Sequence, residues 1–184
     1  VLIDLQGKVV DGQRGGHVNA AGFIIHSAIH EARPDLHCII HTHTAAGMAV
    51  AAQRDGLLPL TQHALKFYGN LAYHTYEGIA LSMQERERLV ADLGSHKAMI
   101  LRHHGLLAAG GSVAAAFHEI YFLERACQAQ IQAMSAGVAL NIPDEAVCRH
   151  TAAQFGRDGI DGIIDLAWQA ALSLIDEQRA DWCS

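Results

Sequence analysis

The spacing of apolar positions changes along the chain between the period of a strand and the period of a helix. Residues 1–12 alternate apolar and polar side chains around Gly7 and end in Asp-Gly, which predicts a strand or a hairpin. Residues 22–36 repeat apolar positions at helical spacing, with Asn19 upstream as the expected cap. This helix should stop just before Pro34, because the residue preceding a proline avoids helical geometry.

The middle of the chain predicts a buried strand followed by shorter elements. Residues 38–44, CIIHTHT, are apolar and rich in β-branched side chains, which is typical of a strand in the interior of a protein. Residues 45–56 predict a short helix that ends at its glycine. A helical segment over Gln62–Phe67 and extended chain over residues 70–76 are expected next.

The second half of the chain alternates long helical patterns with two strands. Residues 82–94 are amphipathic, with Ser82 as the expected cap and Glu85 three residues later, as in a capping box. Residues 97–111 predict two buried strands joined at His-His-Gly. Residues 112–137 predict the longest helix, which a glycine closes.

Two further helical stretches are expected after Pro143. Strands that alternate with helices, without an internal repeat or a low-complexity linker, predict one layered α/β domain over residues 1–184. The first residues already fit a strand. We therefore expect the intact protein to carry an additional segment upstream.

Composition narrows the class of protein. A chain of 184 residues with 51% hydrophobic residues is long and apolar enough to bury a core. The formal charge of −6, without a basic block, argues against nucleic acid as a partner, and no apolar stretch approaches the ~20 residues of a membrane span. Cys38, Cys127, Cys148 and Cys183 form no CxxC pair, which fits a reduced cytoplasm.

Histidine is unusually frequent, with 13 in the chain, and two histidines share one face of the predicted strand. Because side chains alternate across a strand, His41 and His43 should point the same way. Two imidazoles in that arrangement fit a metal site. They equally fit a pair of core histidines that are hydrogen-bonded to backbone or water.

A third ligand would favour the metal site, and the second half of the chain offers two candidates. His103 and His104 follow an apolar strand and precede a glycine turn. Adjacent residues of a strand point in opposite directions, so at most one of them should reach the ion. The spacing does not choose between them. Catalytic zinc typically has three protein ligands and one open position.

The remaining histidines give weaker signals. His26 and His30 lie four residues apart on one helical face and could form a metal pair, although we favour packing roles or hydrogen bonds to the metal ligands. Six histidines have no partner at suggestive spacing and are expected to be surface or structural residues: His17, His37, His74, His96, His118 and His150.

Other polar residues suggest chemistry less clearly. Four close residues fit a core or an interface, and alternatively a proton donor near a metal-bound oxygen: Tyr68, Tyr73, Tyr76 and Glu77. Glu119 and Glu124, on the longest helix, are expected to be solvated or paired. The glycine-rich stretch LAAGGS lacks the lysine of a P-loop, so we predict no nucleotide site.

Two segments together resemble the class II aldolase/adducin family, in particular its adducin-like bacterial branch. They are NAAGFIIHSAIHEARPDLHCIIHTHTAAGMAV and, about sixty residues later, LRHHGLLAAGG. The likeness runs from about Asp4 to about Gly137. It implies a three-layer α/β/α sandwich with a mainly antiparallel central sheet. It also implies a homotetramer with sites at subunit interfaces.

The resemblance implies a metal and its ligands. Enzymes of this family bind zinc, or sometimes manganese or iron, and His41, His43 and His104 match their ligand motif. It therefore favours His104 over His103, which stands where the family usually has asparagine. Sugar-phosphate aldolases of the family carry an acid/base glutamate four residues before the helical histidine, where this chain has Gly22. Their usual phosphate-binding segments would lie upstream of Val1.

These features predict a divalent-metal-dependent C–C lyase, of aldolase type, that acts on a small hydroxy-carbonyl or sugar-phosphate-like substrate. The ion, expected to be Zn²⁺ with Mn²⁺ or Fe²⁺ as alternatives, would stabilise an enolate. His26, His30 and Tyr68 are the candidate catalytic residues. The alternatives are a non-catalytic adducin-like assembly domain, and a decarboxylase or iron oxygenase on the same scaffold.

Overall fold

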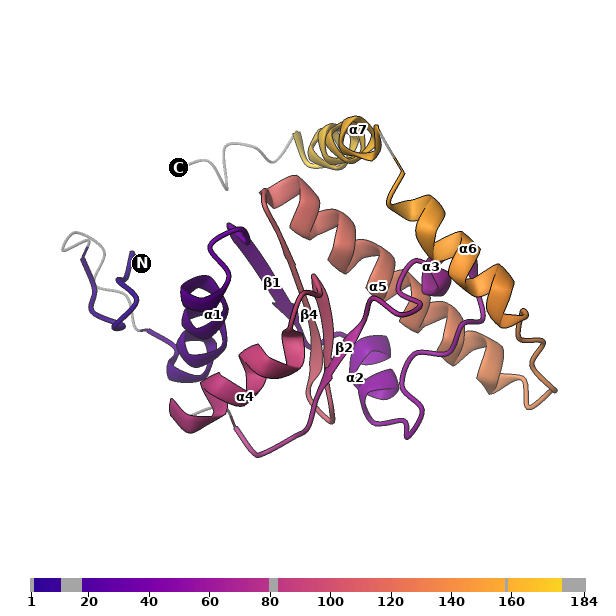
Figure 1. Cartoon of the computed structure of the whole chain (residues 1–184), viewed down its shortest axis with the longest axis horizontal. Helices are drawn as coiled ribbons and strands as arrows, with labels where there is room; N and C mark the ends of the chain where they lie inside the picture. The colour runs from indigo at the N-terminus through magenta and orange to yellow at the C-terminus, as the bar shows by residue number, and fades with distance from the viewer. Residues whose placement is uncertain (1, 11–17, 80–82, 158, 177–184) are drawn as a thin grey trace.

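The computed structural model describes residues 2–10, 18–79, 83–157 and 159–176. Figure 1 shows a central sheet with helices on both of its faces, in agreement with the predicted α/β/α sandwich. None of the helices in these ranges combines the length and the apolar character needed to cross a membrane.

The sheet has four strands in the order β1 (Cys38–Thr42), β4 (Gly105–Gly110), β3 (Ala98–Leu101) and β2 (Ala72–His74). The β1–β4 and β3–β4 pairs are antiparallel, whereas β2 runs parallel to β3. The sheet is therefore mainly antiparallel, as expected. Because β3 turns directly back into β4, and β4 pairs with β1, the β3–β4 turn lies beside the end of β1.

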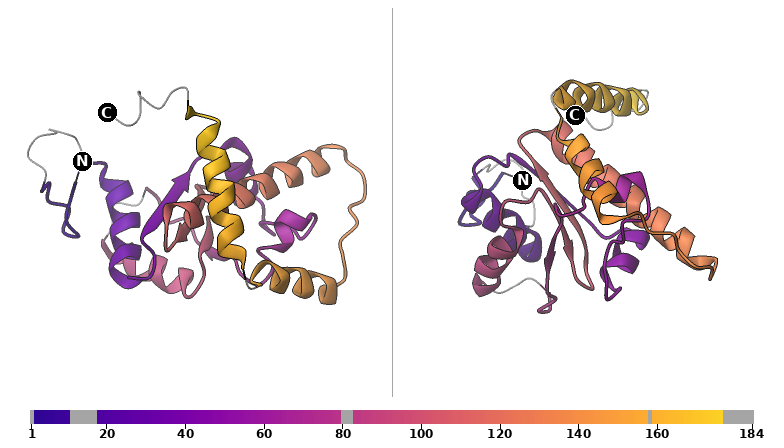
Figure 2. Two further views of the ribbon diagram at one scale, coloured as in Figure 1. Left: turned by 90° about the horizontal axis from the view of Figure 1, so that it is seen from above. Right: turned by 45° about the vertical axis from the view of Figure 1, so that its right-hand side comes forward.

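Two pairs of helices cover the two faces of the sheet, as the right-hand view of Figure 2 shows. On one face lie α1 (Ala20–Ala32) and α4 (Met83–Leu93), and on the other lie α2 (Ala45–Ala51) and α5 (Val113–Ser135). Alternation along each strand supplies both cores.

The core beneath α1 and α4 includes Ile29, Leu93, Met99 and Leu107, all of them buried. The core beneath α2 and α5 also consists largely of buried aliphatic residues, among them Val50, Ile100, Leu106 and Leu123. Neighbouring residues of β3 and of β4 thus enter opposite cores, which explains why both strands are apolar along their whole length.

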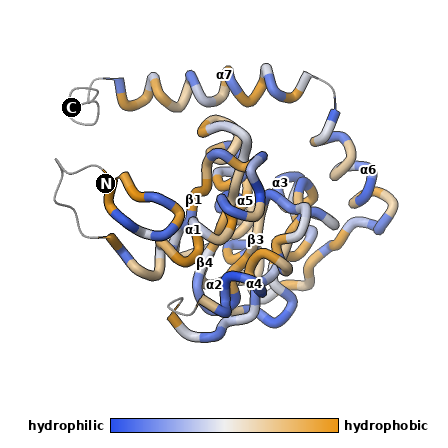
Figure 3. Tube along the Cα trace, turned by 60° about the vertical axis from the view of Figure 1, so that its left-hand side comes forward, coloured by the Kyte–Doolittle hydropathy of each residue, from blue (hydrophilic) through white to orange (hydrophobic). Residues whose placement is uncertain are grey.

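Three helices lie outside these layers: α3 (Gln62–Leu65), α6 (Glu145–Phe155) and α7 (Ile160–Ser173). The two helices predicted after Pro143 are thus present as α6 and α7. The Trp168 ring of α7 lies 5.1 Å from that of Phe117 on α5, centroid to centroid. Figure 3 shows α7 at the periphery, with hydrophobic and hydrophilic positions alternating along it.

Several predicted element ends are confirmed. The Asn19 side chain accepts a hydrogen bond from the Gly22 N–H at 3.0 Å and begins α1, which ends at Ala32, before Pro34. α5 starts after its cap Ser112. The expected cap Ser82 lies outside the described residues.

Other ends differ from the prediction. α2 stops at Ala51 and not at Gly56, because the chain then makes turns in which Gln53 N–H bonds to Val50 and Gly56 N–H to Gln53. Of the extended segment predicted over residues 70–76, only Ala72–His74 pairs as a strand. Near the N-terminus, the described residues form one antiparallel bridge, between Ile3 and Val9.

Candidate metal centre

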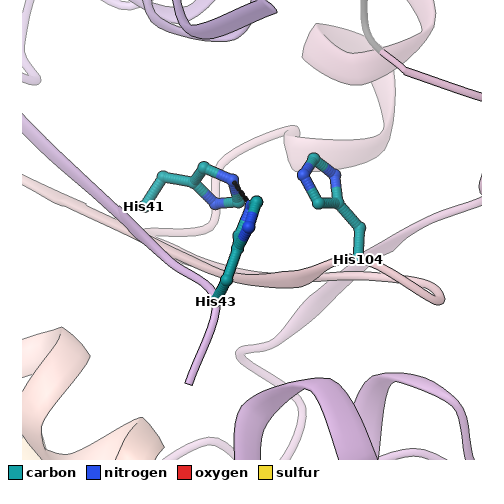
Figure 4. A group of neighbouring side chains, drawn as sticks. All are labelled: His41, His43 and His104. Carbon is teal, nitrogen blue, oxygen red and sulfur yellow. Dashed lines mark hydrogen bonds between the residues drawn. The ribbon is translucent and has the colours of Figure 1, made fainter. Parts of the chain in front are cut away.

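Three histidines from two distant stretches of chain converge at one end of the sheet. His41 is in β1, His43 follows the end of β1, and His104 is in the β3–β4 turn. Their ring centroids are 4.6, 4.8 and 4.7 Å apart in the three pairs. One nitrogen of each ring lies within 4.8 Å of the others, and Figure 4 shows the rings facing a common space.

The turn geometry separates His104 from its neighbour His103. His103 has φ of 55°, in the left-handed region that asparagine adopts more readily than most residues. Its N–H donates to the Ala51 carbonyl at 3.1 Å. This conformation reverses the chain, so that His104 joins His41 and His43 while His103 stays outside the group.

A hydrogen bond fixes which nitrogen of His41 faces the group. Nδ1 donates to the Leu106 carbonyl at 2.8 Å, which leaves Nε2 available. The Nε2 atoms of His41 and His43 are 2.8 Å apart. Two imidazoles bound to one tetrahedral zinc at 2.0–2.1 Å would place their nitrogens about 3.3 Å apart. The three rings therefore fit a divalent cation after a small outward movement.

The protonation state of the rings also suits a metal. Burial lowers the pKa of His41, against the opposing effect of its hydrogen bond to Leu106. Burial, together with repulsion from His41 and His43, lowers the pKa of His104 to about 4. At neutral pH these two imidazoles are uncharged, which is the form that binds a metal.

Close packing at Gly105 brings the turn against β1. A Cβ atom at this position would lie 2.3 Å from the Thr42 carbonyl oxygen and 3.2 Å from a ring carbon of His43. No side chain fits there without moving the backbone. The glycine of the His-His-Gly motif thus allows His104 to approach the His41–His43 pair.

Thr44 holds the chain immediately after His43. Its hydroxyl accepts a hydrogen bond from the Gly47 N–H at 3.2 Å, which caps α2, and donates to the Glu124 carboxylate on α5. Gln128 donates to the same carboxylate at 2.7 Å. Glu124 is paired, as expected, and ties the end of the HTHT motif to α5.

His26 and His30 lie on one face of α1 and outside the group of His41, His43 and His104. Their ring centroids are 6.4 Å apart, and His30 Nδ1 donates to the Leu36 carbonyl at 3.1 Å. Burial lowers the pKa of His26, with smaller effects from the charges of His30 and His41. Both histidines line a cavity of about 430 Å³ together with Gly22.

The tyrosine cluster is divided by the structure. Tyr68 lines a cavity with Leu57 and is not brought to the histidine group. The Tyr73 hydroxyl accepts a hydrogen bond from the Leu57 N–H at 3.0 Å. The Tyr76 ring, in contrast, is 6.5 Å from the His104 ring, centroid to centroid.

Glu77 and Glu119 each form an ion pair. The Glu77 carboxylate bonds to Arg88, with one contact at 2.7 Å. Lys66 Nζ is 2.6 Å from the Glu119 carboxylate. This ion pair lines a cavity of about 600 Å³, and none of the three candidate ligand histidines lines it.

His74 is a buried histidine, in agreement with the expected structural role, and its partners come from α4. It is buried at the end of β2, with one carboxylate of α4 on each side, Asp92 and Glu85. These acids are seven residues apart and so share a face of the helix. The sign of this contact in the sequence is a pair of acidic residues seven positions apart in an amphipathic helix.

Comparison with known proteins identifies relatives of two kinds. Residues 1–131 match the family described as Class II Aldolase and Adducin N-terminal domain. A protein of Caulobacter vibrioides, named for its likeness to class 2 aldolases, is 46% identical over 179 residues, which span 97% of this chain and 69% of the relative. Alpha-adducin of Rattus norvegicus is 46% identical over 137 residues, 73% of this chain but 18% of the adducin.

Solved structures agree with this assignment. An aldolase II superfamily protein from Pseudomonas syringae has a TM-score of 0.89 and 48% identity, covering 96% of this chain and 70% of the other. L-fuculose 1-phosphate aldolase from Glaciozyma antarctica has a TM-score of 0.79 and 31% identity, covering 95% and 68%. This chain belongs to the class II aldolase and adducin family.

Proposed function

We propose that the chain is the metal-binding domain of an aldolase-type C–C lyase that acts on a small hydroxy-carbonyl or sugar-phosphate-like compound. The observation that carries the proposal is the convergence of His41, His43 and His104 on one point. The likeness to L-fuculose 1-phosphate aldolase supports the reaction class. A scaffold alone would not require three imidazoles in this arrangement.

The three histidines would hold a divalent ion, with Zn²⁺ favoured by three nitrogen ligands and Mn²⁺ or Fe²⁺ as alternatives. When bound, such an ion supplies the positive charge that stabilises an enolate oxygen during C–C bond cleavage. The Leu106 carbonyl keeps His41 in one orientation, in which Nε2 would be free to bind the ion. Thr44 and Glu124 restrain the chain beside His43.

Proton transfer needs a group other than the family's glutamate, because Gly22 occupies its place. His26 is one helical turn further along the same face of α1 and lines the same cavity as Gly22. We assign the acid/base role to His26, with His30 beside it. Tyr76 replaces Tyr68 as the candidate proton donor, because its ring lies near His104.

Metal content tests the proposal directly. His41→Ala and His104→Ala should each abolish stoichiometric zinc, manganese or iron in the purified protein, as measured by elemental analysis. His96→Ala is the matched control and should keep the metal. Equal metal content in all three variants would refute the ligand assignment. Wild-type protein loaded with metal should then cleave a compound from a panel of aldol adducts and β-keto acids.

A second candidate function is a non-catalytic assembly domain, which the 46% identity to alpha-adducin and the glycine at position 22 favour. Absence of stoichiometric metal in protein purified without chelators would support it. Iron as the resident metal, without cleavage of any aldol adduct, would instead favour an oxygenase. We further propose a cytoplasmic homotetramer, for which sedimentation of the purified protein at four times the chain mass is the expected result.

A further inference from the structure

His74 is a buried histidine with one ring nitrogen engaged and the other facing an acid. Its side chain is nearly inaccessible, with 4% of the residue exposed. Nδ1 donates to the Asp92 carboxylate at 2.7 Å. Nε2 is 3.5 Å from Glu85 Oε1 and has no hydrogen-bond partner among the residues that the structure describes.

This unpartnered nitrogen is costly where it stands. Because Nδ1 donates to Asp92, Nε2 is the ring nitrogen that faces an oxygen of the buried Glu85, and no hydrogen bond joins these two atoms. A buried polar atom without a partner destabilises a protein, because it has lost its hydrogen bonds to water without gaining another. A water molecule placed between the two atoms can hydrogen-bond to both.

A small cavity is lined by both residues and by His104 of the candidate metal centre. Its volume is about 10 Å³, and its lining includes His74, Glu85, Tyr76 and His104. A cavity of roughly 10–15 Å³ holds one water molecule when polar groups surround it. The ring nitrogens of His104 make no hydrogen bond to other residues in the described ranges, so a water here would also supply a partner for that ring.

We propose that one internal water molecule fills this cavity and links His74 and Glu85 to His104, which makes His74 a positioning residue for the third metal ligand. Each polar atom that faces this water then has a hydrogen-bond partner. The water donates one hydrogen to His74 Nε2 and one to Glu85, and it accepts the N–H of the His104 nitrogen that does not bind metal.

The arrangement would orient the His104 ring through Asp92, His74 and the water. Ligand histidines commonly have their second nitrogen fixed by a carboxylate, a carbonyl or a water, and loss of such a partner typically lowers metal affinity about 10–100-fold. The inference rests on the proposed metal site, but the water itself can be observed without a metal or a substrate.

A high-resolution crystal structure of the purified protein tests the water directly. We expect density for a single water within hydrogen-bond distance of His74 Nε2, a Glu85 oxygen and a His104 ring nitrogen. A direct His74–Glu85 hydrogen bond, a side chain in the cavity, or a cavity without density would overturn the inference. Failure of the wild-type protein to bind zinc, manganese or iron would instead overturn the proposed function.

Two substitutions of His74 separate its two nitrogens. Glutamine places its amide near the position of Nε2 and should keep the contact with the water, whereas asparagine places its amide near Nδ1 and should keep only the contact with Asp92. We expect His74→Asn to weaken zinc binding about 10–100-fold and His74→Gln to stay within a few-fold of wild type, by chelator competition. Equal losses, or the reverse order, would contradict the role of the water.

A matched control excludes general destabilisation as the cause. His118 is also a buried histidine, with 8% exposed, and it lies on α5 across the sheet from α4. His118→Asn should leave zinc affinity unchanged even where it lowers the melting temperature. A loss of zinc affinity that follows melting temperature across all three variants would show a merely structural effect.

Discussion

Gly105 sets how closely the β3–β4 turn approaches β1, and a single methyl group tests this. In Gly105→Ala the new Cβ would lie 2.3 Å from the Thr42 carbonyl oxygen, so the strands must separate. We expect a loss of about 1–3 kcal/mol in the free energy of unfolding, typical of an overpacked site, together with weaker zinc binding. Denaturant unfolding and chelator competition measure the two effects.

Gly111→Ala is the control for that substitution. Its Cβ would meet only the Asp35 carbonyl, at 3.4 Å, which is an ordinary contact. This variant should keep both stability and zinc affinity. If Gly105→Ala behaved in the same way, the close approach of the turn would have no part in forming the metal site.

His26 is the residue on which the proposed proton transfer depends. His26→Gln removes a group that can accept and return a proton and should lower kcat by about 10²–10⁴-fold, the usual contribution of general acid–base catalysis. The metal content should not change, because His26 is outside the ligand group. His37→Gln, at an exposed histidine, should leave kcat as in wild type. An unchanged rate for His26→Gln would reassign the role.

Individual site residues were predictable only where a regular element carried them. Alternation in a strand placed His41 and His43 together. It did not distinguish His104 from His103, because the positive φ of His103 belongs to a turn and follows no strand period. His74 was expected to be a surface or structural residue, but its contacts with Asp92 and Glu85 were not predicted, because nothing near it in the sequence indicates that α4 packs against β2.

The first turn of α1 contains no acidic residue, although Asn19 caps it. Gly22 is the third residue of the helix, where a glutamate would complete a capping box and interact favourably with the helix dipole. A Cβ at Gly22 would have room, with the nearest atom, in the Asn19 side chain, at 3.8 Å. We therefore expect Gly22→Glu to raise the free energy of unfolding by about 1 kcal/mol.

Gly22→Ala separates the two contributions to that gain. Alanine improves helix propensity without adding charge, so it should stabilise the protein by about 0.5–1 kcal/mol. Denaturant unfolding of both variants at neutral pH gives the comparison. If alanine destabilised the protein instead, the backbone at Gly22 would need a conformation other than the helical one described here.

At the level of elements, periodicity predicted most helices and strands but not all of their ends. The long apolar repeat of α5 and its serine cap are local features, and so both ends were close to expectation. The end of α2 depends on turns that return the chain toward Tyr73, which contacts the Gly56–Leu57 segment. The parallel pairing of β2 with β3 is a long-range contact that no local pattern encodes.

Across the whole molecule, the neutral imidazoles of the candidate metal centre make stability depend on pH. An unfolded histidine has its ordinary pKa near 6.5, whereas the pKa of folded His104 is about 4 and that of His41 is also lowered. Between these values the unfolded chain binds more protons than the folded chain, so a falling pH favours unfolding. This contribution to stability is fully present above pH 6.5 and is lost as the pH falls through about 4.

Thermal unfolding of the metal-free protein between pH 7 and 4 measures this effect. We expect the melting temperature to fall across that range, and to fall less steeply in His104→Ala than in wild type. Parallel slopes for the two proteins would show that His104 does not contribute to the acid sensitivity.

The position of β1 at the end of the described sheet has one more consequence. Its hydrogen-bonded neighbour on one side is β4, and the described residues place no strand on its other side. An ion bound by His41, His43 and His104 would connect this edge strand to the adjacent β3–β4 hairpin. The cation would then hold the edge of the sheet together, and its removal would loosen the fold first around the three histidines.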